Sequence, residues 1–149
     1  MNALWTRPGL RPDVELAVAL ELCAYELTRA RSPRQLEQAI SLNLRLWRTL
    51  RRLAEAGWAV CRRETLADTA DHVVTMLVAE ATPCPDPRDL AFIAGRNLAL
   101  ARDLAGQSAA ESAMAGLMES WGGVGGGINA FALWLIGRLG REEQQYPNG

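Results

Sequence analysis

The sequence predicts an all-α protein, a compact helical bundle of four to five helices that is followed by a glycine-rich hinge and a C-terminal apolar helix. Apolar residues make up 49% of the 149 residues but aromatic residues only 6%, so the core must be built mainly from aliphatic side chains. These apolar residues recur at spacings of three and four, which place them on one face of a helix. A chain of this length is expected to form one real hydrophobic core.

The first two helices have the clearest signals. Residues 13–30 are apolar on most sides, which predicts a buried and central helix. The next helix is expected to begin at Ser32, because this hydroxyl can cap the helix, Pro33 suits the first helical position, and Gln35 completes a capping box. This second helix is expected to end near Gly57, because glycine commonly follows the last residue of a helix.

The following helices are bounded by capping signals, glycines and prolines. They are expected from Thr65 to about Ala81, from Asp86 to near Gly106, and from Ser108 to Trp121. Asp86 can cap its helix with Pro87 at the first position. The closely spaced prolines before this point predict an irregular connection.

Residues 122–127 contain five glycines in six positions. Glycine loses more backbone entropy than other residues on ordering, so this run predicts a hinge. It divides the chain into a bundle domain, residues 1–121, and a C-terminal segment, residues 128–149. Within that segment an apolar helix is expected at 128–139, before a frayed polar tail.

The C-terminal helix has three interpretations. It can fold onto the bundle, enter a groove of a partner, or lie on a membrane surface. Arg138 and Arg141 are followed at once by Glu142 and Glu143, which argues against anionic lipid and favours docking onto protein.

The charge and the cysteine content limit the possible classes of partner and the cellular compartment. The formal net charge is −1, from 16 basic residues that are all arginine and 17 acidic residues, so nucleic acid is not an expected partner. The three cysteines match neither a disulfide framework nor a metal motif, which indicates a reducing compartment. No apolar run reaches the length of a membrane span and none resembles a signal peptide, so we expect a cytoplasmic protein.

Residues that could support catalysis are few, and we expect no enzymatic activity, cofactor or metal. His72 is the only histidine, and no HExxH or GxSxG motif is present. Asp68 and Asp71 lie near it at helical spacing, where carboxylates usually line a solvated face. The glycine run cannot be a phosphate loop of the GxxxxGK[ST] type, because the chain contains no lysine.

Asn43 and Asn97 interrupt apolar stripes and are therefore the most informative polar residues. A buried amide is costly unless it is hydrogen-bonded. Either each amide bonds to a neighbouring helix and fixes its register, or both face an open groove where they bind a partner's backbone. In the second case Trp47 would be the aromatic anchor and Arg45 would lie at the rim.

The segment Asn43-Leu44-Arg45-Leu46-Trp47 resembles the FlaF family of flagellar biosynthesis regulators, which carry N-x-R-x-W in a helix after an apolar first helix. The segment Phe92-Ile93-Ala94-Gly95-Arg96-Asn97 resembles the family's L-I-x-x-N-R, with the last two residues reversed, and the resemblance covers roughly residues 13–106. It implies a cytoplasmic, non-enzymatic helical protein that binds flagellin and acts with the regulator FlbT. It also implies structural or partner-binding roles for Asn43, Arg45, Trp47 and, more weakly, Asn97.

Three functions are compatible with these observations. The leading hypothesis is a protein-binding bundle whose apolar groove receives an amphipathic helix, such as the terminal helices of flagellin. The second is a homodimer in which the C-terminal helix packs on a second copy. The third is a bundle that binds a small ligand or lipid in a pocket lined by Trp47, Met76 and Phe92.

Overall fold

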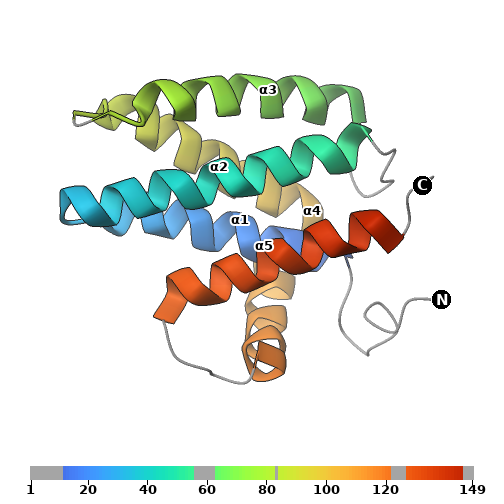
Figure 1. Ribbon diagram of the computed structural model, residues 1–149. Coiled ribbons are helices and arrows are strands. Elements are labelled where there is room, and N and C mark those ends of the chain that lie inside the picture. The colour runs from blue at the N-terminus through green and yellow to red at the C-terminus, as the bar shows by residue number, and fades with distance from the viewer. Residues whose placement is uncertain (1–11, 56–62, 83, 122–126, 146–149) are drawn as a thin grey trace.

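The computed structural model describes residues 12–55, 63–82, 84–121 and 127–145, and these residues form five helices and no strand (Figure 1). The helices are α1 (Pro12–Arg29), α2 (Pro33–Glu55), α3 (Arg63–Glu80), α4 (Pro87–Trp121) and α5 (Gly127–Gln145). The all-α helical bundle predicted from the sequence is confirmed. None of the helices is long and apolar enough, over its described residues, to cross a membrane.

α1 is the central helix of the bundle. Five consecutive residues, from Leu16 to Leu20, have no exposed surface, which a helix achieves only when neighbours cover all its sides. α4 packs along it from behind in Figure 1, while α2 and α5 lie in front and α3 is outermost, against α2. The apolar first helix is therefore buried as predicted.

The helix starts at α2 and α4 show the expected caps. The backbone N–H of Gln35 donates to Ser32 Oγ at 3.1 Å, and Gln35 Oε1 accepts from the backbone N–H of Arg31 at 2.8 Å. Asp86 Oδ1 accepts from the Arg88 N–H at 2.9 Å at the start of α4. α3 begins at Arg63, so the start predicted at Thr65 is two residues late.

α4 corrects one prediction. It is a single helix of 35 residues, so the expected stop near Gly106 and the new start at Ser108 are wrong. An interior glycine costs a helix only about 1 kcal/mol relative to alanine. Ala113 and Leu117, beyond the glycine, are buried in the same hydrophobic cluster as the first half of α4, and this packing outweighs the local signals. In Figure 1 the second half of α4, drawn in orange, runs in a different direction from the first half and extends below α1.

α5 packs on the bundle, as in the first of the three interpretations. Phe131, Leu135 and Leu139, at spacings of four, are buried in the core shared with α1 and α2. The helix begins at Gly127, the last residue of the expected hinge, and continues to Gln145, so the tail is helical further than predicted. Residues 122–126 lie outside the described residues, and the division into domains stays a prediction.

A buried ion pair joins α5 to the central helix. Arg138 Nε lies 2.6 Å from Glu15 Oε1, and the two side chains are 4% and 0% exposed. Arg138 also lies over the Trp134 ring, with its Cζ 5.6 Å from the ring centroid. A charge pair this deeply buried fixes the position of α5 along α1, because moving either partner would leave a charge in an apolar environment.

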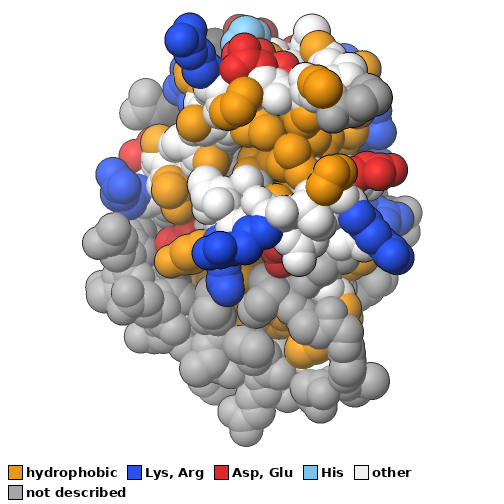
Figure 2. All heavy atoms as spheres, turned by 90° about the vertical axis from the view of Figure 1, so that its left-hand side faces the viewer, with side chains coloured by type: hydrophobic (Ala, Val, Ile, Leu, Met, Phe, Trp, Pro, Cys, Tyr) orange, Lys and Arg blue, Asp and Glu red, His pale blue; other side chains and the backbone are white. Residues whose placement is uncertain are grey.

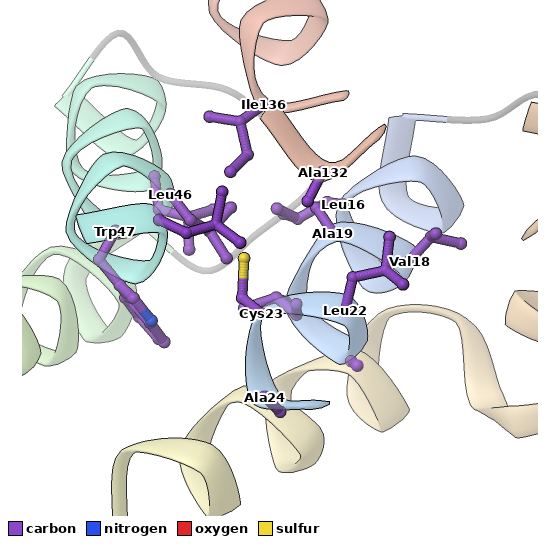
Figure 3. Packing of buried hydrophobic residues seen from close by; sticks show 14 of the residues in the cluster. Leu16, Val18, Ala19, Leu22, Cys23, Ala24, Leu46, Trp47, Ala132 and Ile136 are labelled. Carbon is purple, nitrogen blue, oxygen red and sulfur yellow. The ribbon is translucent and has the colours of Figure 1, made fainter. Parts of the chain in front are cut away.

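The cysteines provide a test of the core. Cys23 is fully buried among apolar side chains (Figure 3), and burial raises the pKa of its thiol well above the ordinary value, whereas Cys84 is exposed. Because only the thiolate reacts, we expect iodoacetamide at pH 8 to modify Cys84 at least roughly a thousandfold faster than Cys23. Peptide mapping by mass spectrometry checks this. Comparable rates at the two sites in folded protein would contradict the packing of α1.

Candidate functional site

The residues singled out on α2 and α4 form a buried polar network. Asn97 Oδ1 accepts a hydrogen bond from Trp47 Nε1 at 2.9 Å, and Asn97 Nδ2 donates to Asn43 Oδ1 at 2.8 Å. Asn97 Nδ2 also donates to the Leu20 carbonyl at 3.2 Å, and Asn43 Nδ2 donates to the Cys23 carbonyl at 2.9 Å. All three side chains are completely buried. The network therefore links α2 and α4 to each other and to the backbone of α1.

Every polar group of the two amides is satisfied within the chain. Asn43 Nδ2 makes its second bond to the Ala39 carbonyl at 2.9 Å, so both amide nitrogens use two donors and both oxygens accept. A fully satisfied network in a low-dielectric core specifies one register of the helices around it. This geometry is the first of the two alternatives for Asn43 and Asn97.

The suggested partner-binding residues differ in accessibility. Asn43, Trp47 and Asn97 are fully buried, so a partner could touch them only if the helices separated. Arg45 is exposed on the outer face of α2. A role of these four residues in partner binding stays a prediction, and for the three buried ones the contacts support an indirect role that holds α2 in place.

An open apolar groove lies at the end of the bundle where α1 turns into α2 and α3 connects to α4. Its volume is about 850 Å³. Figure 2 views this end and shows apolar side chains gathered in a hollow of the surface. The groove is lined by Ala30, Arg31, Ser32, Pro33, Leu36, Glu37, Ile40, Ser41, Leu44, Ala81, Thr82 and Pro85.

The floor of the groove comes from α2. Leu36, Ile40 and Leu44 follow one another at spacings of four, so they form an apolar strip about 12 Å long at 1.5 Å per residue. Leu36 and Leu44 are only partly buried, although both pack against the core. Among the residues that the structure describes, the strip therefore keeps apolar surface exposed at Leu36 and Leu44.

The opposite wall is the connection between α3 and α4, and its shape is fixed by a buried carboxylate. Glu80 Oε2 accepts a hydrogen bond from the Asp86 N–H at 2.6 Å, and Glu80 is 7% exposed. The Thr82 N–H donates to the Glu80 carbonyl at 2.8 Å. These bonds hold the wall residues Ala81 and Pro85 beside α2 without the help of a ligand.

The sequence suggested an apolar groove but did not locate this one. By their spacing, Leu36 and Ile40 belong to the apolar stripe of α2 that also contains Asn43 and Trp47, which predicts a place in the core. The opposite wall is an irregular connection, and its position cannot be predicted from periodicity. The available signal was Leu44, an apolar residue beside the stripe. The pocket expected between Trp47, Met76 and Phe92 differs from the groove, which contains none of these residues.

The remaining polar residues of interest, His72 and Arg51, lie on the exposed surface of α3 and α2. His72 is exposed, and its ring meets the Phe92 ring edge to face with centroids 6.1 Å apart. Among the described residues, no group of three or more histidine, cysteine and acidic side chains could hold a metal ion. Arg51 on the outer face of α2 is paired with Glu55 at 3.2 Å and with Asp71 at 3.0 Å.

Comparison of the chain with protein-family models, with curated proteins and with solved structures found no match.

Proposed function

We propose that this chain is a non-enzymatic helix-binding protein, in which the groove over Leu36, Ile40 and Leu44 receives the apolar face of an amphipathic helix from a protein partner. The observation that carries the proposal is this uncovered apolar strip on α2. Helix-in-groove recognition uses anchors at i, i+3 or i+4 and i+7. A strip about 12 Å long spans two helical turns, which matches three such anchors.

The lining of the groove also suits a helix. Arg31 and Glu37 offer one charge of each sign, and Ser32, Ser41 and Thr82 place hydroxyl groups among the apolar side chains. A polar rim around an apolar floor is the usual anatomy of a protein interface. The volume also falls in the range of small-molecule sites, so a small apolar ligand is an alternative occupant that the test below must separate.

We further propose flagellin as the partner, on the basis of the resemblance of Asn43-Leu44-Arg45-Leu46-Trp47 to the FlaF family. The residues of this motif make two different kinds of contact. Asn43 and Trp47 point into the core and hold α2 against α1 and α4, whereas Leu44 lines the groove. The terminal helices of flagellin are amphipathic partners of the kind that the groove would accept, and FlbT is a second candidate by the same resemblance.

The proposal predicts that Leu44→Glu removes partner binding. A carboxylate in the middle of the apolar strip would have to be desolvated when a helix docks, so we expect the Kd for monomeric flagellin to rise at least about a hundredfold. Isothermal titration calorimetry with purified flagellin from the organism that encodes the chain measures this Kd for the wild type and the variant. The matched control is Val78→Glu, since Val78 is 52% exposed and lies outside the groove lining.

The outcomes distinguish the partner from the site. Loss of binding in folded Leu44→Glu with wild-type affinity in Val78→Glu supports both. Equal affinities in the two variants would exclude the groove. No binding of flagellin by the wild type would exclude this partner, and native mass spectrometry of the purified protein would then show whether a small apolar molecule occupies the groove.

A further inference from the structure

Arginine side chains are concentrated on α2 beside the groove, although the whole chain has a formal net charge of −1. Arg34, Arg45 and Arg48 are exposed on this helix, and Arg31 belongs to the groove lining. Between positions 31 and 48 the one acidic residue is Glu37. Figure 2 shows arginine side chains near the hollow on two sides. The α2 side of the groove therefore has an excess of positive charge that the composition of the chain does not predict.

Helical spacing places Arg45 and Arg48 next to the groove. Ser41 and Leu44 line the groove, and residues three or four positions apart on a helix are neighbours, with Cβ atoms about 5–6 Å apart. Arg45 follows Ser41 by four positions, and Arg48 follows Leu44 by four positions. Because arginine has a long stem, both guanidinium groups can reach a helix that occupies the apolar strip.

The charges of these two arginines are not neutralised within the described part of the chain. Arg51, three positions after Arg48, pairs with Glu55 at 3.2 Å and with Asp71 at 3.0 Å. No described acidic side chain forms an ion pair with Arg45 or Arg48. Their positive charges are therefore free to interact with a molecule that docks in the groove.

The acidic groups near the groove are more fully compensated. Glu37 lies three positions after the exposed Arg34, within reach on the same face of the helix. On the opposite wall, Asp86 accepts a hydrogen bond from the Arg88 N–H at the start of α4, where the positive end of the helix dipole offsets its negative charge. The surface charge is therefore positive along α2 and nearly balanced at the wall.

We infer that the partner helix is acidic, with glutamate or aspartate side chains along the edge of its polar face that lies over Arg45 and Arg48. This inference rests on the proposed function, because it concerns the occupant of the same groove. The hollow shape favours a helix over an anionic membrane, since a flat lipid surface cannot enter a groove that a helix about 10–12 Å across can occupy. Complementary charge would let α2 select acidic amphipathic helices and reject basic ones.

Three synthetic amphipathic peptides test the charge of the partner. They share leucine anchors at i, i+4 and i+7 and differ in a polar face of glutamate, glutamine or lysine, which have similar helix propensities. Fluorescence anisotropy of the labelled peptides with the full chain gives each Kd. At low salt, we expect the glutamate peptide to bind about tenfold more tightly than the glutamine peptide, and the lysine peptide about tenfold more weakly. At about 0.5 M salt, these differences should fall below about threefold.

Charge variants of the chain assign this preference to α2. Arg48→Glu should weaken binding of the glutamate peptide about tenfold and leave the Kd of the glutamine peptide within about threefold. The matched control is Arg102→Glu, which changes the net charge equally at an exposed position of α4 outside the groove lining. This control should keep all three Kd values of the wild type. Circular dichroism checks that both variants are folded.

The outcomes separate this inference from the proposed function. Equal Kd values for the three peptides, with binding of the glutamine peptide lost in Leu44→Glu, would overturn the acidic partner and retain the groove. Failure of the wild type to bind any of the peptides, or binding of the glutamine peptide that Leu44→Glu does not weaken, would overturn both. Binding of phosphatidylserine vesicles without binding of the glutamate peptide would identify a membrane surface and overturn the inference.

Discussion

Replacing Asn97 with alanine is expected to lower the free energy of unfolding by about 3–5 kcal/mol. The change removes the acceptor of Trp47 Nε1 and the donor to Asn43 Oδ1, and both groups remain buried. Each unsatisfied buried polar group costs about 1–3 kcal/mol, and the missing volume adds a cavity term. Urea denaturation followed by circular dichroism measures the effect as a lower midpoint at constant slope.

The network interpretation also predicts coupling. Trp47→Phe removes one donor and should cost less than Asn97→Ala, and the loss caused by Asn97→Ala should be smaller when Trp47 is already phenylalanine. Arg45→Ala, an exposed change on α2, is the control and is expected within about 0.5 kcal/mol of the wild type. Two results would show that the network does not stabilise the fold. One is a cost below about 1 kcal/mol for Asn97→Ala, and the other is a double variant whose loss of stability equals the sum of the two single losses.

The second large effect is expected at the ion pair between α5 and α1. Arg138→Met removes the guanidinium that lies 2.6 Å from Glu15, and the buried carboxylate loses this counter-charge. Breaking a buried pair from one side costs about 3–5 kcal/mol. The same denaturation experiment detects the loss, and hydrogen exchange should show it first in α5, whose position depends on the pair.

The matched double variant separates charge from packing. Glu15→Met combined with Arg138→Met fills a similar volume with apolar side chains, and replacing both partners is often neutral. The double variant should therefore recover most of the stability lost in Arg138→Met. If it is less stable than the single variant, the pair contributes by packing or by other contacts of Glu15 and not by its charges.

The parts of the fold that depend on local signals could be predicted from the sequence. The capping of α2 at Ser32 and of α4 at Asp86 rests on hydrogen bonds between residues two to four positions apart. The burial of α1 follows from its composition alone. The same local reasoning failed at Gly106 and Ser108, where burial of Leu117 in the common core decides that the helix continues.

The parts of the site that depend on distant residues could be predicted only in outline. The sequence indicated that Asn43 and Asn97 need hydrogen-bond partners, but they bond to each other across 54 positions of the chain, and Asn97 reaches Leu20 across 77. The groove joins the first turns of α2 to the α3–α4 connection, and no periodicity reports that contact. No described residue of α5 lines this groove.

α2 combines the two halves of the candidate site. Its inward face places Asn43 and Trp47 in the network, and its outer strip supplies Leu36 and Leu44 to the groove. Because the network fixes α2 against two other helices, the floor of the groove is formed before any partner arrives. A preformed site avoids the entropy cost of ordering on binding.

The central claim is that a partner helix docks in the groove over α2, and a titration of methyl-labelled protein with monomeric flagellin, followed by NMR, tests it most directly. The account predicts that the methyl signals of Leu36, Ile40 and Leu44 shift on binding, while those of Val78 and Leu98 stay in place. Shifts confined to Val78 and Leu98, or no shifts at saturating flagellin, would contradict it.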